Sequence, residues 1–276
     1  MTSRIAAAFA KARAENRLAL VTHVIPGYPS TAETPGIFDA MVEGGAGLIE
    51  VQIPFSDPLA DGTTVQRGVF EALDNGTTPA SCIEFARAAR ARHPDVAIIF
   101  MSYLNPVLAY GVERFAQDAA AAGGDGIILV DLPPEEAATT KAAFNRAGLD
   151  LIFLAAPTSS EHRLQLIAAQ AGGFVYCVSV AGVTGARSEL PPDLRHFIGR
   201  VRRCTALPLA VGFGISRREH IEALAGVADG AVIGSATMDL INNRAPGERV
   251  SAVREYIETL SGRRQAGSVS PPVSPR

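Results

Sequence analysis

The sequence predicts an α/β protein folded as a closed (β/α)8 barrel. Eight short runs rich in apolar and β-branched residues recur at a spacing of roughly 25 to 30 residues, and an Ala-rich helical stretch follows each run. The runs are almost continuously apolar, as parallel strands covered on both faces should be. Eight strand–helix units within 276 residues match the number of units and the usual length of a TIM barrel.

Local residue patterns place the individual elements. Helical stretches such as residues 112–123 and 135–148 end at glycine, which commonly terminates a helix. Ile5, Phe9 and Ala12 share one helical face near the N-terminus, which predicts a capping helix before the first strand. An open doubly wound sheet is the alternative, but no G-x-G-x-x-G motif follows the first strand. The predicted strands cover residues 18–24, 47–53, 97–103, 126–132, 150–156, 174–180, 208–213 and 230–236.

The composition predicts one domain with a large core. Of the residues, 47% are hydrophobic and 19% are charged. We expect the domain to cover residues 1–261 and the Pro/Ser/Gly-rich segment 262–276 to be a disordered tail. The net charge of −3 gives no reason to expect a nucleic acid or an anionic membrane as the partner.

We expect this protein to be cytoplasmic. No apolar run approaches the roughly 20 residues needed to span a bilayer. The N-terminal segment lacks the apolar region and cleavage pattern of a secretory signal. Cys82, Cys177 and Cys204 form no CxxC pair, so we expect buried, small apolar side chains in a reducing compartment.

Glu50 is the first candidate for a catalytic residue. Side chains alternate along a strand, so Ile49, Val51 and Ile53 should pack against helices while Glu50 points into the barrel near its mouth. Partial loss of solvent would raise the pKa of this carboxyl and suit it to proton exchange near neutral pH. A lone strand glutamate more often pairs with an arginine, but the loop that follows favours a functional role.

That loop, residues 54–66, is unusually polar and restricted for a connection. Two prolines limit its backbone, while Ser56, Asp57 and Asp61 can bond local amides or a ligand. One of the two aspartates is expected only to stabilise a local turn. The spacing does not decide which one.

Three late loops predict a phosphate site. Residues 181–187, 211–216 and 232–236 are all Gly-containing and follow predicted strands six, seven and eight. Gly214 precedes one predicted helix, and Gly234 precedes another. Helix N-termini with free amides hold phosphate, and barrels often place that site after strands seven and eight.

Five short motifs carry a more specific signal. In chain order they are "IEVQIPFSDPLADG" (49–62), "SYLNPV" (102–107), "GVTGAR" (182–187), "GFGIS" (212–216) and "GSA" (234–236). Together they resemble the α subunit of tryptophan synthase, and the string "PFSDPLADG" is highly specific. The similarity runs from about residue 4 to residue 260.

The resemblance implies both a reaction and a partner. The family has a TIM barrel and is a lyase of tryptophan biosynthesis, which cleaves indole-3-glycerol phosphate by retro-aldol chemistry to indole and glyceraldehyde 3-phosphate. The resemblance implies that no metal or organic cofactor is required. It also implies a partner, because the family normally binds a PLP-dependent β subunit in an αββα complex and passes indole to it through a tunnel.

The resemblance also implies roles for residues at matching positions. Glu50 would donate and accept protons at the indole ring carbon and the side-chain hydroxyl, and Asp61 would stabilise the charge that develops on the indole nitrogen. Thr184, in the mobile loop 182–190, would close over the site and orient Asp61. The remaining roles are pocket lining by Tyr176, phosphate binding by Gly185, Gly214, Gly234 and Ser235, and β-subunit docking by Asp57, Asn105 and Pro106.

Two places depart from the family pattern. The family usually has Leu-Gly after the catalytic glutamate, whereas Val51 and Gln52 stand here. Gln52 should point toward the mouth beside Glu50, where it could crowd the substrate or hydrogen-bond Glu50 and shift its pKa. In the first loop, residues 25–27 read Ile-Pro-Gly where the family commonly has Thr-Ala-Gly.

Other functions stay open on these residues. One is a stand-alone lyase that releases free indole. Another is a catalytically weakened barrel that serves as an allosteric partner of a β subunit, although the presence of both Glu50 and Asp61 argues against it. A phosphosugar isomerase on the same fold would share the late phosphate loops but would not explain residues 54–62.

Overall fold

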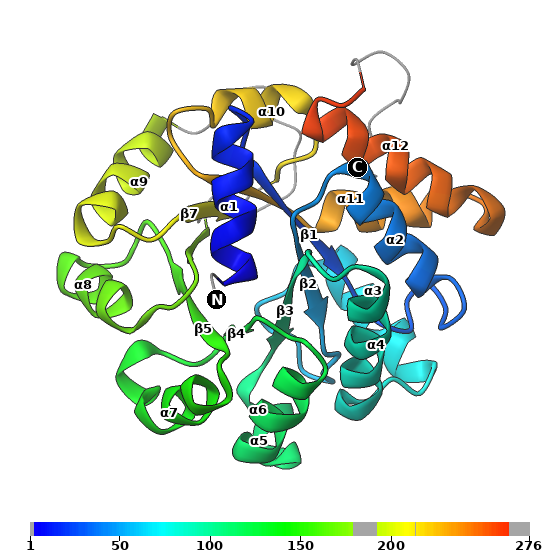
Figure 1. The fold of residues 1–276 in the computed structure, drawn as a ribbon, viewed down its shortest axis with the longest axis horizontal. Coiled ribbons are helices and arrows are strands. Elements are labelled where there is room, and N and C mark those ends of the chain that lie inside the picture. Colours follow the sequence, from blue (N-terminus) through cyan, green and yellow to red (C-terminus); the bar gives the residue numbers. More distant parts are fainter. Residues whose placement is uncertain (1–2, 179–191, 213, 265–276) are drawn as a thin grey trace.

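A computed structural model describes residues 3–178, 192–212 and 214–264 and contains a closed barrel of parallel strands (Figure 1). All eight predicted strands are confirmed within a few residues of their expected ends. Each strand pairs with its neighbours in sequence, and the last closes on the first. The strands are β1 (Ala19–Val24), β2 (Leu48–Gln52), β3 (Ala97–Ser102), β4 (Gly126–Leu129), β5 (Asp150–Ala155), β6 (Val175–Val178), β7 (Leu209–Gly212) and β8 (Gly230–Ile233).

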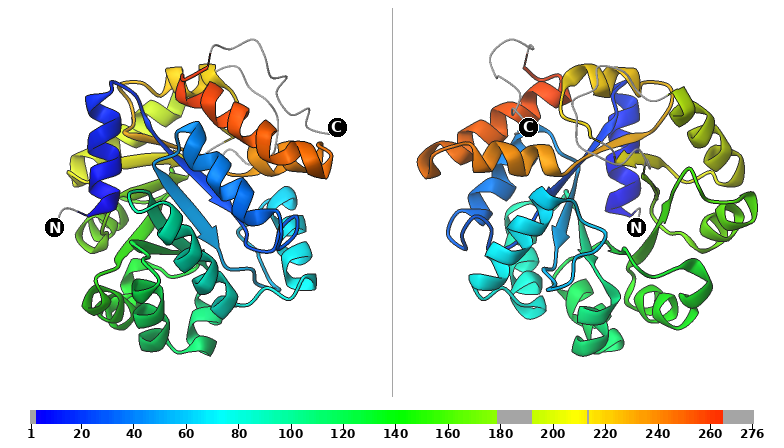
Figure 2. Two further views of the ribbon diagram at one scale, coloured as in Figure 1. Left: turned by 45° about the vertical axis from the view of Figure 1, so that its right-hand side comes forward. Right: turned by 180° about the vertical axis from the view of Figure 1, so that it is seen from behind.

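Helices form a ring around the barrel (Figure 2). Within the described residues none of them is long and apolar enough to cross a membrane. α12 packs against α2 and so closes the ring. The α-helices are α1 (Arg4–Ala14), α2 (Thr34–Gly44), α3 (Thr63–Asp74), α4 (Pro79–Arg92), α5 (Leu104–Tyr110), α6 (Val112–Ala121), α7 (Ala138–Ala147), α8 (Glu161–Gln170), α9 (Pro192–Cys204), α10 (Arg218–Ala223), α11 (Ser235–Asn242) and α12 (Arg249–Ser261), with the 3-10 turns η1 (Pro134–Glu136) and η2 (Pro246–Glu248).

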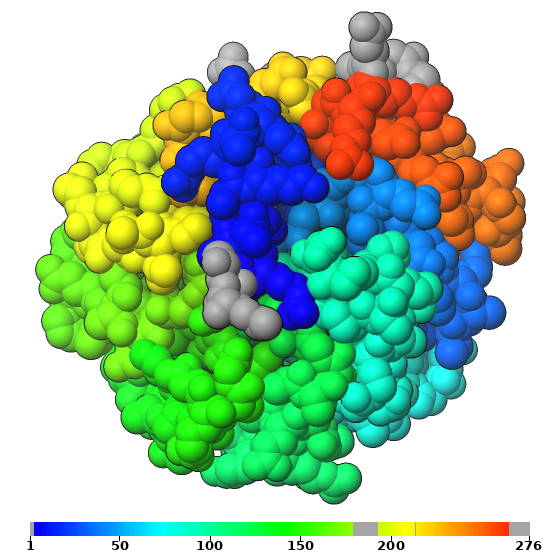
Figure 3. All heavy atoms as spheres, in the orientation of Figure 1, coloured from blue at the N-terminus to red at the C-terminus, as the bar shows by residue number. Residues whose placement is uncertain are grey.

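α1 covers the N-terminal end of the barrel, which confirms the predicted capping helix (Figure 3). Ile5, Phe9 and Ala12 are its buried residues. They belong to the apolar cluster that fills the barrel interior, and the Phe9 ring lies 5.6 Å from the ring of Phe174. The helix thus closes one end of the barrel and leaves the other end for a ligand.

Alternation along β2 sorts its side chains as predicted. Ile49, Val51 and Ile53 belong to the apolar layer between barrel and helices, whereas Leu48 belongs to the interior cluster. Glu50 pairs in register with His23 of β1, so both residues face the barrel interior at the same level.

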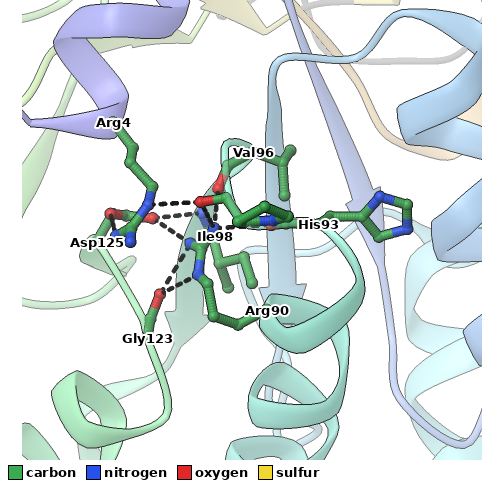
Figure 4. A network of polar contacts seen from close by, with 8 residues as sticks. Arg4, Arg90, His93, Val96, Ile98, Gly123 and Asp125 are labelled. Atoms are coloured by element: carbon green, nitrogen blue, oxygen red, sulfur yellow. Dashed lines mark hydrogen bonds and ion pairs between the residues drawn. The ribbon is translucent and has the colours of Figure 1, made fainter.

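A polar network ties the N-terminal ends of β3 and β4 to α1 and α4 (Figure 4). Arg90 Nη2 lies 2.7 Å from Asp125 Oδ2, and Arg4 Nη1 lies 3.0 Å from Asp125 Oδ1. The Ile98 amide also donates to Asp125 Oδ2 at 2.9 Å. Arg90 further donates to the backbone oxygens of Val96 and Gly123 at 2.7 Å and 2.8 Å. The Asp125 side chain is only 8% exposed, and each of its two oxygens has an arginine partner.

The structure tests only part of the predictions for the C-terminal tail and the cysteines. α12 ends at Ser261, and residues 265–276 lie outside the described residues, so the predicted tail stays a prediction. The domain limits stay a prediction as well. Cys82 and Cys177 are buried, whereas Cys204 is half-buried; all three carry free thiols.

Candidate active site

A cavity of about 300 Å³ opens at the C-terminal ends of the strands. Its depth is apolar, lined by residues such as Ile128, Leu154 and Val232. Its polar side chains come from β1, β2, β6, the loop after β2 and the first residues of α3 and α11. The predicted site residues that line it are Glu50, Asp61, Tyr176, Gly214, Gly234 and Ser235. Elements far apart in the sequence therefore meet around one space large enough for a small molecule.

Glu50 is buried in this cavity without a charged partner among the described residues. Its side chain is 1% exposed, and its Oε1 atom has no hydrogen-bond partner. Burial raises the pKa of Glu50 to about 8. A carboxyl group with such a pKa keeps its proton at neutral pH and can donate it to a ligand. The alternative reading, a structural glutamate paired with an arginine, finds no support in the described part of the chain.

Asp61 reaches the same cavity from the loop after β2. Its Oδ2 atom accepts a hydrogen bond from Gln52 Nε2 at 2.9 Å, and the Tyr103 hydroxyl also bonds its carboxyl group. Burial raises the pKa of Asp61, while these two hydrogen bonds oppose the increase. The Gln66 side chain donates to the backbone oxygen of Asp61 at 2.8 Å and thereby fixes the end of the loop.

The structure shows which of the two aspartates faces the cavity. Asp57 is exposed, and its Oδ2 atom accepts a hydrogen bond from the hydroxyl of Ser56 at 2.6 Å. It does not line the cavity. Asp61 is therefore the aspartate that faces the site.

Gln52 points into the cavity as predicted. Of its two suggested effects, crowding of the substrate and a hydrogen bond to Glu50, the hydrogen bond is absent from the described contacts. Its amide instead joins His23 and Asp61: Oε1 lies 2.5 Å from His23 Nε2, and Nε2 donates to Asp61. The geometric reason is that His23 and the Asp61 loop flank Gln52. Burial lowers the pKa of His23 to about 4, so the imidazole is neutral at physiological pH.

His23 is absent from the predicted site residues. It lies two positions after the inward-facing Val21 on β1, so the alternation applied to β2 would have found it. Tyr176, by contrast, is where the resemblance predicts. Its half-buried ring stacks on that of Phe174 with 6.5 Å between the ring centroids, and loss of solvent raises the pKa of its hydroxyl well above the usual value.

The opposite wall of the cavity is built from backbone. Gly212, Gly214, Gly234 and Ser235 line it, and Ser235 is the first residue of α11. No Lys or Arg is among the described lining residues, so an anion here would be held by amides and the α11 N-terminus. Thr184 and Gly185 lie outside the described residues.

The predicted docking residues lie together beside the mouth. Asn105 and Pro106 on α5 line a groove with Pro54 and Phe55 of the loop after β2, and Asp57 continues that loop. Two large apolar side chains are exposed on the same segments: Leu59 is 90% and Leu108 53% exposed. Within the described segments no group of three His, Cys, Asp or Glu residues could hold a metal ion.

Comparisons with known proteins identify the family of this chain. The family model for the tryptophan synthase alpha chain matches residues 9–266. The tryptophan synthase alpha chain of Roseiflexus castenholzii is 47% identical over 94% of this chain and 100% of its own length. That of Chloroflexus aurantiacus is 48% identical over 94% of this chain and 97% of its own length.

Solved structures show the same fold. Tryptophan synthase from Mycobacterium tuberculosis superimposes with a TM-score of 0.87 and 36% identity, covering 97% of this chain and all of that chain. The tryptophan synthase alpha chain from Legionella pneumophila gives a TM-score of 0.86 at 32% identity, covering 95% of this chain and 97% of that one. The chain therefore belongs to the tryptophan synthase alpha chain family, and its reaction is the indole-3-glycerol-phosphate lyase step of tryptophan biosynthesis.

Proposed function

We propose that Glu50 and Asp61 carry out the retro-aldol cleavage of indole-3-glycerol phosphate in the cavity at the mouth of the barrel. The observation that supports this most is that both carboxyl groups line the same cavity as the glycine-rich ends of β7 and β8. One substrate could place its ring between the carboxyl groups and its phosphate at the glycines. The products would be indole and glyceraldehyde 3-phosphate.

Glu50 would act as the acid and then as the base. Its raised pKa supplies a proton at neutral pH to the ring carbon that bears the side chain. The resulting carboxylate then accepts the proton of the adjacent side-chain hydroxyl. The carbon–carbon bond breaks, its electron pair returns to the ring, and the former alcohol carbon becomes the aldehyde.

Asp61 would stabilise the intermediate cation. Protonation of the ring carbon leaves a positive charge shared with the ring nitrogen, and a nearby carboxylate lowers the energy of that state. Asp61 must be ionised for this task, and its hydrogen bonds from Gln52 and Tyr103 favour the ionised form. The two carboxyl groups therefore need opposite protonation states when the substrate binds.

The phosphate would bind at the amides of Gly214, Gly234 and Ser235. The N-terminus of α11 favours an anion there, and the cavity is open beside Gly234, where an added Cβ would meet only the Cβ of His23 at 4.0 Å. Gly185 and Thr184 keep the roles that the resemblance implies, as a phosphate ligand and as part of a lid that orients Asp61.

The groove beside the mouth would receive a β subunit. Exposed Leu59 and Leu108 flank the segments that carry Asp57, Asn105 and Pro106, and exposed apolar groups with a polar rim suit a protein interface. We infer an αββα complex in the cytoplasm, where the free thiols stay reduced.

The test is an assay of the purified chain with indole-3-glycerol phosphate, with and without a tryptophan synthase β subunit. Indole should form, and its rate should rise when the β subunit is added. No indole under either condition would contradict the lyase function. Full activity of the chain alone, unchanged by the β subunit, would instead support the stand-alone lyase.

A further inference from the structure

A chain of hydrogen bonds runs through the cavity from His23 to Gln52 to Asp61. The three residues come from β1, β2 and the loop after β2, and His23 and Gln52 are at most 4% exposed. The two contacts measure 2.5 Å and 2.9 Å. Gln52 stands where the family usually has glycine, so this link depends on a side chain that the usual pattern lacks.

The direction of each hydrogen bond follows from the acceptor at its end. An ionised carboxylate only accepts, so the group of Gln52 that meets Asp61 must be the amide NH2. The Gln52 carbonyl oxygen then faces His23, and His23 Nε2 must carry the proton that it donates. His23 Nδ1 is left as a buried acceptor with no hydrogen-bond partner. One orientation of the amide and one tautomer of the imidazole are thus selected together.

The geometry points to Gln52 as a positioning residue that holds the Asp61 carboxylate in the cavity, with His23 fixing the orientation of the Gln52 amide. This inference rests on the proposed role of Asp61. It goes beyond that role because it assigns the control of Asp61 to two residues on strands of the barrel, His23 on β1 and Gln52 on β2.

Two features make this control effective. Asp61 lies on a loop, whereas β1 and β2 are hydrogen-bonded to each other and buried along their whole length, so Gln52 reaches the Asp61 carboxyl group from a fixed position on the barrel. In addition, burial lowers the pKa of His23 to about 4. The imidazole is therefore uncharged at neutral pH and places no positive charge near the Asp61 carboxylate. The link therefore delivers a hydrogen bond to Asp61 without adding a charge.

The test measures kcat, KM and the pH profile of kcat/KM for Gln52→Met and His23→Leu. Methionine keeps the length of Gln52 but cannot donate to Asp61, so kcat should fall about tenfold or more, the value of a lost hydrogen bond to a charged group. The acid limb of the profile should move to higher pH, because an interaction that lowers the pKa of Asp61 is lost. Binding of inorganic phosphate should stay unchanged.

The other groups that face Asp61 remain in these variants. They are Tyr103 in contact with the carboxyl group, and Glu50 and Tyr176 across the cavity. The alkaline limb should therefore stay where it is while the acid limb moves. His23→Leu should change the profile in the same direction, and the double variant should be no worse than Gln52→Met, because the two residues act in series.

Gln66→Met is the matched control. Gln66 donates to the backbone oxygens of Pro58 and Asp61, so it holds the same loop without touching the Asp61 carboxyl group. Its loss should leave the acid limb in place. In the wild-type protein, 15N NMR of His23 should show the tautomer with the proton on Nε2.

Asp61→Asn separates the two possible failures. If that variant retains normal turnover, the proposed role of Asp61 is wrong. If it is inactive but Gln52→Met keeps the wild-type kcat and acid limb, only the positioning role is wrong. An Nδ1–H tautomer of His23, or additive effects of Gln52→Met and His23→Leu, would also overturn the series arrangement.

Discussion

The two ends of this barrel bury a carboxyl group in opposite ways. At the N-terminal end, Asp125 receives two arginines and a backbone amide (Figure 4). At the C-terminal end, Glu50 is more deeply buried and has no charged partner among the described residues. A buried carboxyl group that is paired with arginines and an amide stabilises the fold. A buried carboxyl group without such partners keeps its proton and is available to a ligand. The difference matches the division of TIM barrels into a stability face and a catalytic face.

Exchanging each acid for its amide should separate these two roles most strongly. Glu50→Gln should lower the rate of indole formation by at least about a thousandfold, because the amide can neither give nor take the proton. Asp125→Asn should retain the wild-type kcat. Steady-state assays of indole release check both variants, and a Glu50→Gln enzyme with near-normal turnover would remove the distinction.

Loss of a partner at the N-terminal end should act on stability alone. Arg90→Met leaves Asp125 with only Arg4 and the Ile98 amide, and the Arg90 side chain is 13% exposed. We expect the free energy of unfolding to fall by about 3 kcal/mol, as for other broken buried pairs. Urea denaturation measures this, with Arg67→Met as control, because Arg67 forms an exposed ion pair with Glu71. Equal losses in the two variants would contradict a special role for the buried pair.

Stability should depend on pH through Glu50. Its pKa is about 8 in the folded protein and near 4.5 when unfolded, so the folded state holds the proton more tightly. The contribution of Glu50 to the free energy of unfolding is therefore fully present below pH 4.5. It is lost as the pH rises through the folded-state pKa of about 8. Relative to Glu50→Gln, the wild-type free energy of unfolding should fall by about 3–4 kcal/mol between pH 5 and pH 8. Parallel curves for the two proteins would show that Glu50 does not titrate in this range.

A substitution in the glycine-lined wall of the cavity should weaken substrate binding. Gly234→Val would place methyl groups in open space beside the α11 N-terminus, so KM should rise about tenfold with little change in unfolding. Gly247→Val is the control, since Gly247 is exposed and also has open space around it. An unchanged KM for Gly234→Val would place the phosphate elsewhere.

The fold and the carboxyl groups could be predicted because their signals are local. Continuous apolar runs identify parallel strands, and the two-residue period turned Glu50 inward while its neighbours faced the helices. The choice between Asp57 and Asp61 depended on the path of the loop, which Gln66 and Tyr103 determine from α3 and the start of α5.

The contacts of Gln52 could not be predicted in the same way. Its partner His23 lies 29 residues earlier and meets it only through the register of β1 on β2. A hydrogen bond to Glu50 was one of the two suggested effects because the two side chains are close along β2, but the amide turns instead toward two groups that satisfy both of its ends. Tertiary register thus decides the partner of a buried polar side chain where sequence spacing cannot.

A 13C NMR titration of the Glu50 side-chain carboxyl measures the property on which the difference between the two ends depends. The signal is assigned by its absence from Glu50→Gln in protein labelled at glutamate. A midpoint at about pH 8 is expected for the free protein. A midpoint near 4.5, the ordinary value for glutamate, would mean that Glu50 is already ionised at neutral pH and cannot be the acid that protonates the indole ring.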